Sequence, residues 1–111
     1  MIRNISGDFL ELMAERFQML ADPTRLAILR TLMEGEKSVG EIVELTEQGQ
    51  ANVSKHLRLL SQSGLVSRRK DGLKAFYSIQ DPVLERICNL VCKTMLREAD
   101  SASKRLRRGT K

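Results

Sequence analysis

The stretch from Gly49 to Tyr77 concentrates side chains that can bind a nucleic acid. Small polar residues and a lysine occupy the first turns of a predicted helix over 50–62, where a helix can meet base edges and phosphates. A predicted hairpin follows, and it offers four cations to a second stretch of sugar-phosphate backbone: Arg68, Arg69, Lys70 and Lys74. These residue types in this order favour binding to double-stranded DNA.

The net positive charge of the chain comes from two segments. The 111 residues carry a formal net charge of +5. Residues 1–47 contain five basic and nine acidic side chains, whereas residues 48–75 contain six basic side chains and one acidic side chain. The last eleven residues add five basic side chains and no acidic ones. Because charge of one sign is gathered in this way, the chain is expected to attract phosphates on one face.

The composition narrows the class of protein. A hydrophobic content of 41% in 111 residues indicates one globular domain with a modest core. Three Phe, one Tyr and no Trp leave few rings for stacking bases, which argues against RNA or single strands as the ligand. No 18-residue apolar run and no signal-peptide pattern occur, so we expect no membrane partner and a cytoplasmic location.

Hydrophobic spacing and capping residues predict a mainly α (α+β) fold with five helices and one hairpin. The helices are expected at about 8–20, with Asp8 as a cap, and at 23–33, 38–46, 50–62 and 82–97 or beyond. Strands are expected at 65–69 and 73–79, between the fourth and fifth helices, with Lys70-Asp71-Gly72 as the turn. The third and fourth helices form a helix-turn-helix, and the hairpin forms a wing. Residues 1–100 would be the DNA-binding and dimerisation domain, and residues 101–111 a flexible basic tail.

The first and last predicted helices carry more apolar residues than so small a domain can bury. An exposed apolar band of this size suggests a partner, and two such helices can form a symmetric dimer interface. The alternative is that the two helices pack on each other within one chain. The residues expected at the dimer interface are Phe9, Leu12, Met13, Phe17, Leu84, Ile87, Cys88, Val91, Cys92 and Met95.

Five segments in order resemble the ArsR/SmtB family of small bacterial winged-helix repressors. They are residues 20–29 (LADPTRLAIL), 38–42 (SVGEI), 53–57 (VSKHL), 64–66 (GLV) and 76–77 (FY). The resemblance spans about residues 9–97 and is specific as an ordered set. It implies a homodimer that binds a near-palindromic operator and releases it when an inducer binds.

The resemblance also assigns DNA contacts along the fourth helix. Gln50 and Asn52 are suited to reading an adenine, and Ala51 to touching a thymine methyl group. Ser54 and Lys55 suit phosphates or a guanine edge. Two further residues complete the predicted DNA-binding set, His56, which we interpret as a structural group rather than a metal ligand, and Arg58, which faces phosphate or solvent.

The metal sites of the family are not matched. The third helix lacks the Cys-x-Cys pair of many members. Asp81 matches the first ligand of another site, but Val83, Thr94 and Arg97 occupy its other three positions. Zinc and nickel bind several imidazole, carboxylate or thiolate ligands, which neither position set supplies.

Cys88 and Cys92 are the remaining candidate sensor. On one helix their Cα atoms lie about 6 Å apart, within the disulfide range, but their parallel side-chain directions would strain a bridge within one chain. A dimer would gather four thiols. Such a set suits a soft metal or metalloid, or an oxidised or persulfide bridge, and the alternative is two inert packed thiols. A constitutive regulator, a protein-interaction module and a small thiol oxidoreductase stay as alternative functions. One histidine and no nucleophile–base set argue against an enzyme.

Overall fold

The computed structural model describes residues 5–109 of the chain, with side chains through residue 106. The chain divides into two compact units, Met1–Asp81 and Pro82–Lys111. Among the described helices, none combines the length and apolar character that crossing a bilayer requires.

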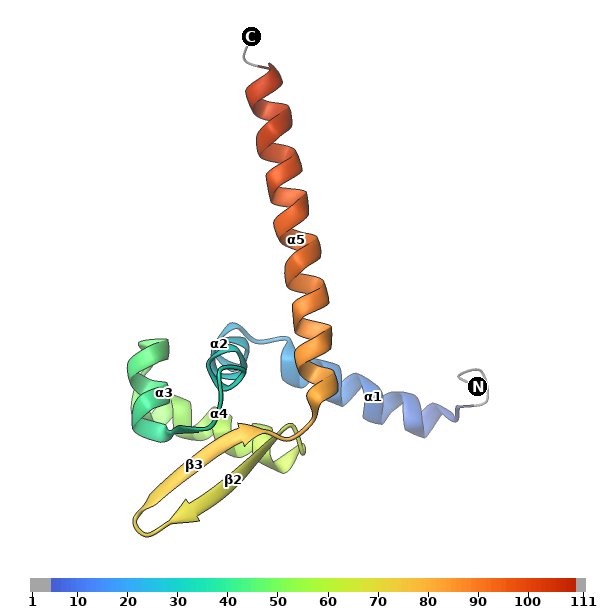
Figure 1. Ribbon diagram of the computed structural model, residues 1–111. Helices are drawn as coiled ribbons and strands as arrows, with labels where there is room; N and C mark the ends of the chain where they lie inside the picture. The colour runs from blue at the N-terminus through green and yellow to red at the C-terminus, as the bar shows by residue number, and fades with distance from the viewer. Residues whose placement is uncertain (1–4, 110–111) are drawn as a thin grey trace. The chain divides into compact units, whose positions relative to one another are not determined.

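The first unit is a winged helix-turn-helix (Figure 1). Its hairpin follows the helix pair α3 (Val39–Thr46) and α4 (Gln50–Gln62), and a further helix, α5 (Pro82–Gly109), forms the second unit. This arrangement confirms the predicted mainly α fold. The elements of the first unit are α1 (Gly7–Leu20), α2 (Pro23–Leu32), β1 (Lys37–Ser38), α3 (Val39–Thr46), α4 (Gln50–Gln62), β2 (Val66–Asp71) and β3 (Lys74–Ile79).

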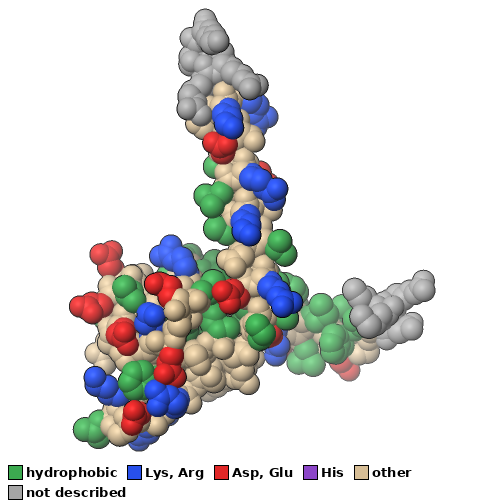
Figure 2. Space-filling view, in the orientation of Figure 1, with side chains coloured by type: hydrophobic (Ala, Val, Ile, Leu, Met, Phe, Trp, Pro, Cys, Tyr) green, Lys and Arg blue, Asp and Glu red, His purple; other side chains and the backbone are tan. Residues whose placement is uncertain are grey.

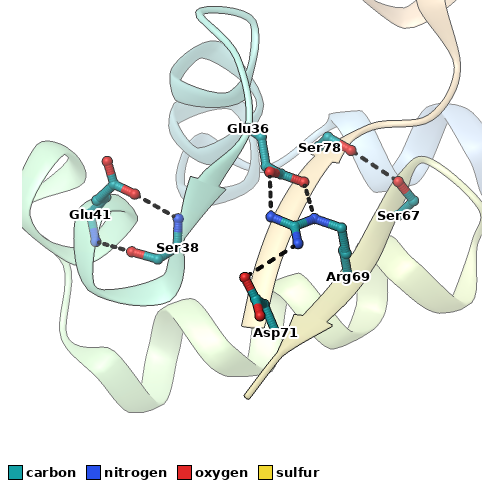
Figure 3. A network of polar contacts seen from close by, with 7 residues as sticks. All are labelled: Glu36, Ser38, Glu41, Ser67, Arg69, Asp71 and Ser78. Carbon is teal, nitrogen blue, oxygen red and sulfur yellow. Dashed lines mark hydrogen bonds and ion pairs between the residues drawn. The ribbon is translucent and has the colours of Figure 1, made fainter. Parts of the chain in front are cut away.

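Side-chain caps fix where the first three helices begin. The Asp22 carboxylate accepts a hydrogen bond of 3.0 Å from the Arg25 backbone N–H, and Pro23 occupies the first helical position of α2. Ser38 and Glu41 form the predicted capping box of α3, with bonds of 3.0 and 3.2 Å (Figure 3). These bonds satisfy backbone donors that a helix start leaves open.

The cap predicted for helix α1 was wrong. Ser6, with extended backbone dihedrals, is the N-cap, and its hydroxyl accepts from the Phe9 backbone N–H at 3.2 Å. Asp8 lies instead in the first turn, where its negative charge is favourable beside the positive end of the helix dipole.

The wing belongs to a three-stranded antiparallel sheet of order β1-β3-β2. Strand β1 was not predicted, because two residues are too short to show the alternation of a strand. The turn also lies further along than the predicted Lys70-Asp71-Gly72. Asp71 still pairs with Lys74, and Gly72 takes a positive φ of 63° that glycine accommodates without strain.

The core of the first unit holds α4 by its inner face. Val53, Leu57 and Leu60 of α4 are fully buried, at the i, i+4, i+7 spacing that marks one side of a helix. They lie in a core that also contains Ile28, Leu29, Leu32, Ile42, Leu65 and Val66. Burying one such side chain contributes roughly 1.5–3 kcal/mol, so this packing determines which face of α4 remains outside.

Helix α5 (Pro82–Gly109) is longer than predicted and includes most of the segment expected to be a flexible tail. Residues 101–106 are good or neutral helix formers, and Asp100 and Lys104 form an i,i+4 ion pair at 3.2 Å. Residues 110–111 of the predicted tail lie outside the described residues.

The Asp22 cap makes the stability of the fold depend on pH in acid. The hydrogen bond from the Arg25 backbone N–H is the main reason that the pKa of Asp22 lies below its ordinary value of 3.8. A carboxylate with a lowered pKa stabilises the fold above its unfolded-state pKa, and this contribution is lost as pH falls through the folded-state value. We expect Asp22→Ala to lower the melting temperature by a few degrees at neutral pH.

That difference from the wild type should shrink towards pH 2, to the size of the Asn-to-Ala difference, in thermal melts followed by circular dichroism. Asp22→Asn is the matched control, because its amide oxygen still caps the helix without titrating. A wild-type-to-Ala difference that is constant from pH 7 to pH 2 would contradict this role for the Asp22 charge.

Candidate nucleic-acid interface

The outer face of α4 presents the polar residues that the sequence placed there. Gln50, Ser54 and Arg58 follow each other at intervals of four, and Ala51 and Lys55 lie beside them at the same spacing. The six exposed residues of the predicted set on this helix are Gln50, Ala51, Asn52, Ser54, Lys55 and Arg58. The structure therefore brings these six together on a single surface of the first unit.

The beginning of α4 is open to a ligand. Gly49 is its N-cap and provides no side-chain hydrogen bond to the first turn. The Asn52 side-chain amide donates to the Gln48 side-chain oxygen at 3.3 Å. This hydrogen bond lies near the start of α4 but does not cap its backbone N–H groups. Free backbone N–H groups and the positive end of the helix dipole both favour a phosphate at such a site.

The strand register divides the basic residues of the wing between two faces. Arg68 lies opposite Tyr77, and Lys70 lies opposite Ala75, on the face that also carries the buried Val66. Because alternate residues of a strand point to opposite faces, Arg69 lies on the other side. Lys74, which pairs with Asp71, is also on that other side. The four cations therefore lie on two faces of the wing, Arg68 and Lys70 on one and Arg69 and Lys74 on the other.

A cationic groove lies between α4 and the wing. Lys55 and Arg58 reach it from the helix, Arg68 reaches it from β2, and none of these three is ion-paired within residues 5–106. The full lining is Ala51, Ser54, Lys55, Arg58, Ser61, Gln62, Arg68 and Tyr77. Cations without internal partners beside hydroxyl and amide groups form a surface that attracts phosphate.

Three residues of this groove were missed in the sequence, namely Ser61, Gln62 and Tyr77. The Ser61 hydroxyl oxygen is buried and has no hydrogen-bond partner in the described part of the chain. Continuing the helical spacing by three and four residues from Arg58 would have reached Ser61 and Gln62. The position of Tyr77 opposite Arg68 required the hairpin register, which the sequence alone did not fix.

Arg69 has a different environment from Arg68. Its guanidinium donates to both carboxylate oxygens of Glu36, at 2.9 and 3.1 Å (Figure 3). It also lies 4.8 Å from the centre of the Phe76 ring. This hydrogen bonding lowers the pKa of Glu36 and raises the pKa of Arg69. Arg69 therefore ties the wing to the segment before β1, and its charge is already balanced.

His56 does not face the outer surface of α4. Its side chain is 8% exposed, on the buried side of the helix, and its Nδ1 lies 3.3 Å from Nη1 of Arg25. Among the predicted DNA-binding residues it is the one that the structure places inside, because its position follows the buried spacing of Val53, Leu57 and Leu60.

The predicted dimer residues of α1 are available on its surface. Phe9, Leu12 and Phe17 are 49%, 62% and 52% exposed, and no residue of α1 is buried. Figure 2 shows hydrophobic side chains along this helix. These residues are therefore surface rather than core.

Helix α5, considered by itself, carries a second set of exposed apolar side chains. Val91 is 53% exposed and Met95 is 62% exposed, Ile87 is half-buried, and Leu84, at 2%, is buried. Leu90, Leu96 and Leu106, which were not in the predicted set, are more than 60% exposed.

The two thiols lie on α5 and differ in environment. Cys92 is exposed, Cys88 is half-buried, and both are free. Burial raises the pKa of the Cys88 thiol, which disfavours its thiolate. Within the described residues, no group of three or more His, Cys, Asp or Glu side chains is arranged to hold a metal ion.

This combination of a helix-turn-helix, a wing and a cationic outer face defines a winged-helix DNA-binding protein. The sequence profile of the family described as "Bacterial regulatory protein, arsR family" matches residues 22–68. A probable mercury resistance operon repressor of Streptomyces lividans is 42% identical over 90 residues, which are 81% of this chain and 70% of that protein. The chain belongs to the arsR family of bacterial regulatory proteins.

Solved structures agree with this assignment. The crystal structure of Rv0081 from M. tuberculosis is similar with a TM-score of 0.76 and 33% identity, over 86% of this chain and 97% of that one. The NMR structure of the homodimeric DNA-binding domain of Mb0332 from Mycobacterium bovis, a possible ArsR-family regulator, gives a TM-score of 0.75 and 28% identity, over 86% and 92%. The chain is thus a DNA-binding transcriptional regulator and not an enzyme.

The two faces of the wing give a direct test with adjacent residues. We expect Arg68→Ala to weaken binding to every duplex and to lower the slope of log affinity against log salt by about one per subunit. Arg69→Ala should leave the salt slope within error and should instead lower the melting temperature, because it loses Glu36 and the Phe76 ring. Fluorescence anisotropy over a salt series measures the first effect.

Glu36→Gln is the matched control for Arg69, since it removes the balancing charge and leaves the guanidinium in place. Equal losses of salt slope from Arg68→Ala and Arg69→Ala would show that the register does not separate their roles.

Proposed function

We propose that this protein is a homodimeric transcriptional repressor. In each subunit the outer face of α4 reads base edges in a major groove, and the wing and the adjacent groove bind the flanking backbone. The observation that carries the proposal is the shared surface of α4 and β2, where Lys55, Arg58 and Arg68 line one groove beside the exposed Gln50 and Asn52. Gln50 and Asn52 can form paired hydrogen bonds with adenine, and the cations supply attraction that is independent of sequence.

The exposed apolar surfaces support the dimer. A groove beside α1, whose lining includes Phe9, Leu12, Met13 and Met19, presents mostly apolar surface to solvent. An apolar face of this kind is stabilised when a second copy covers it, and a self-complementary patch closes as a twofold dimer. The homodimeric state of the Mycobacterium bovis domain supports the same assembly here. The two reading helices would then be about 34 Å apart, or a small multiple of that distance, on a near-palindromic operator.

For the inducer we propose a thiol-reactive signal at Cys88 and Cys92. The similar Streptomyces lividans protein is described as a probable mercury resistance repressor, and mercury is a soft, thiol-binding metal. The exposed Cys92 can also be oxidised or persulfidated. Release of DNA would follow if the modified or metal-bound dimer preferred a form with lower operator affinity.

The test of DNA reading uses two variants on the same face of α4. The DNA is the region upstream of the protein's own operon, with an unrelated duplex for comparison. Lys55→Ala should weaken binding to both duplexes and reduce the salt slope. Gln50→Ala should mainly relax sequence preference, by about 1–3 kcal/mol at one base pair of each half-site.

Arg30→Ala is the matched control, because Arg30 is exposed on α2 outside this face. Sedimentation of the free protein should give a dimer at micromolar concentration. A monomer that binds neither duplex at low salt would sink the proposal and would favour a protein-interaction module.

The test of sensing compares the wild type with the double variant Cys88→Ser, Cys92→Ser. Mercury(II), cadmium, arsenite, peroxide and a persulfide are each titrated into the protein–DNA complex, and anisotropy reports release. We expect at least one of them to weaken wild-type binding by about 5–150-fold, a typical coupling between two sites, and to leave the double variant unaffected. If none of them releases the wild type, a constitutive regulator is the better description.

A further inference from the structure

Hydrogen bonds from two arginine side chains tie helix α1 to the rest of the first unit. The helix contains no buried residue, yet its exposed apolar side chains form part of the surface proposed for the second subunit. The apolar side chains of α1 are thus at most half-buried, as Met13, Met19 and Leu20 are. Arginine side chains near its C-terminal end add directional contacts between α1 and the reading helix α4.

Arg25 is the centre of these contacts. Its Nε donates to the Met19 carbonyl oxygen at 2.8 Å, and its Nη2 donates to the Gln18 carbonyl oxygen at 3.2 Å. Both carbonyls belong to the last turn of α1, where the Gln18 oxygen also accepts from the Ala21 backbone N–H at 3.1 Å. The positive charge also matches the negative end of the helix dipole.

The third arm of the same guanidinium reaches the reading helix. Nη1 of Arg25 lies 3.3 Å from Nδ1 of His56, on the buried side of α4 between the exposed residues Lys55 and Arg58. A guanidinium has only donors, so Nδ1 accepts, and the proton of the neutral imidazole is on Nε2. One rigid, planar group therefore connects the end of α1 to the middle of α4.

The backbone of Arg25 is fixed as well. Its N–H donates to the Asp22 carboxylate at 3.0 Å, which sets the start of α2 and the origin of the side chain. A second and weaker tie runs from Arg16 of α1 to the Ser63 carbonyl at the end of α4, at 3.4 Å. Arg25 is the stronger tie, because it makes shorter bonds and is partly buried.

We propose that Arg25 is a positioning residue for DNA reading: through His56 it holds α4 at the angle to α1 that places the two reading helices of the dimer in register with the operator. The inference rests on the proposed dimer. Arg25 itself touches no DNA. Its loss should therefore misalign the reading helices while the phosphate-binding cations remain in place.

Loss of Arg25 should therefore affect binding to a specific duplex more than binding to an unrelated duplex. The probes are a duplex that the wild-type protein selects from a randomised pool and a scrambled duplex of equal length. Arg25→Lys keeps the charge but loses the planar fork. We expect it to lower affinity for the selected duplex by about tenfold or more, the size of a lost base contact. Affinity for the scrambled duplex should stay within about twofold of the wild type, and the salt slope should stay the same as in the wild type.

The histidine supplies an independent pair of variants. His56→Leu removes the acceptor and should reproduce the loss of specificity. His56→Asn keeps an oxygen close to the position of Nδ1 and should retain most of it. The double variant Arg25→Lys, His56→Leu should lose little more than either single variant, because both act on one contact. Arg30→Lys, an exposed arginine on the same helix as Arg25, is the control and should behave as the wild type.

Each result decides the question. Sedimentation and thermal melts confirm that a variant is dimeric and folded, and if Arg25→Lys is unfolded the two His56 variants carry the test. Equal loss on selected and scrambled duplexes, additive losses in the double variant, or a wild-type specificity ratio in Arg25→Lys and His56→Leu would overturn the positioning role. A wild-type protein that is monomeric or selects no duplex would instead overturn the proposed function, and this inference with it.

Discussion

The burial of one side of helix α4 is the constraint on which the DNA-binding surface depends. Val53, Leu57 and Leu60 lie in the core and cannot rotate out without exposing apolar area to water. The same packing orients Gln50, Ser54, Lys55 and Arg58 outward and keeps His56 inside. The core-facing residues and the proposed DNA-facing residues thus lie on opposite sides of the same short helix. A substitution on the buried side therefore shifts the exposed side.

Much of the fold could be predicted because local signals agreed with tertiary packing. The Asp22-Pro23 start, the Ser38–Glu41 capping box and the apolar spacing of 50–62 each correspond to an observed element. Elements whose origin is tertiary were missed. Strand β1 consists of two residues that form a strand only because β3 lies beside them. The extension of α5 beyond its predicted end has a local origin instead, in helix-forming residues and the Asp100–Lys104 ion pair.

The same distinction applies to the candidate site. Residue types along α4 were sufficient to place five polar residues and Ala51 on its exposed side. They were not sufficient for His56, whose partner Arg25 lies 31 positions away in the chain. Nor did they reveal that Glu36 balances the charge of Arg69, because contacts between distant segments leave no periodic trace in a sequence. Whether the exposed residues touch DNA stays a prediction.

The register of strand β2 has an evolutionary consequence. Neighbouring arginines at 68 and 69 look interchangeable in a sequence, yet one lines the groove beside α4 and the other is bound to Glu36. An insertion or deletion of a single residue before this pair would exchange their faces and undo both arrangements at once. Length changes in the wing should therefore be tolerated at its tip, or in steps of two, whereas point substitutions there can accumulate freely.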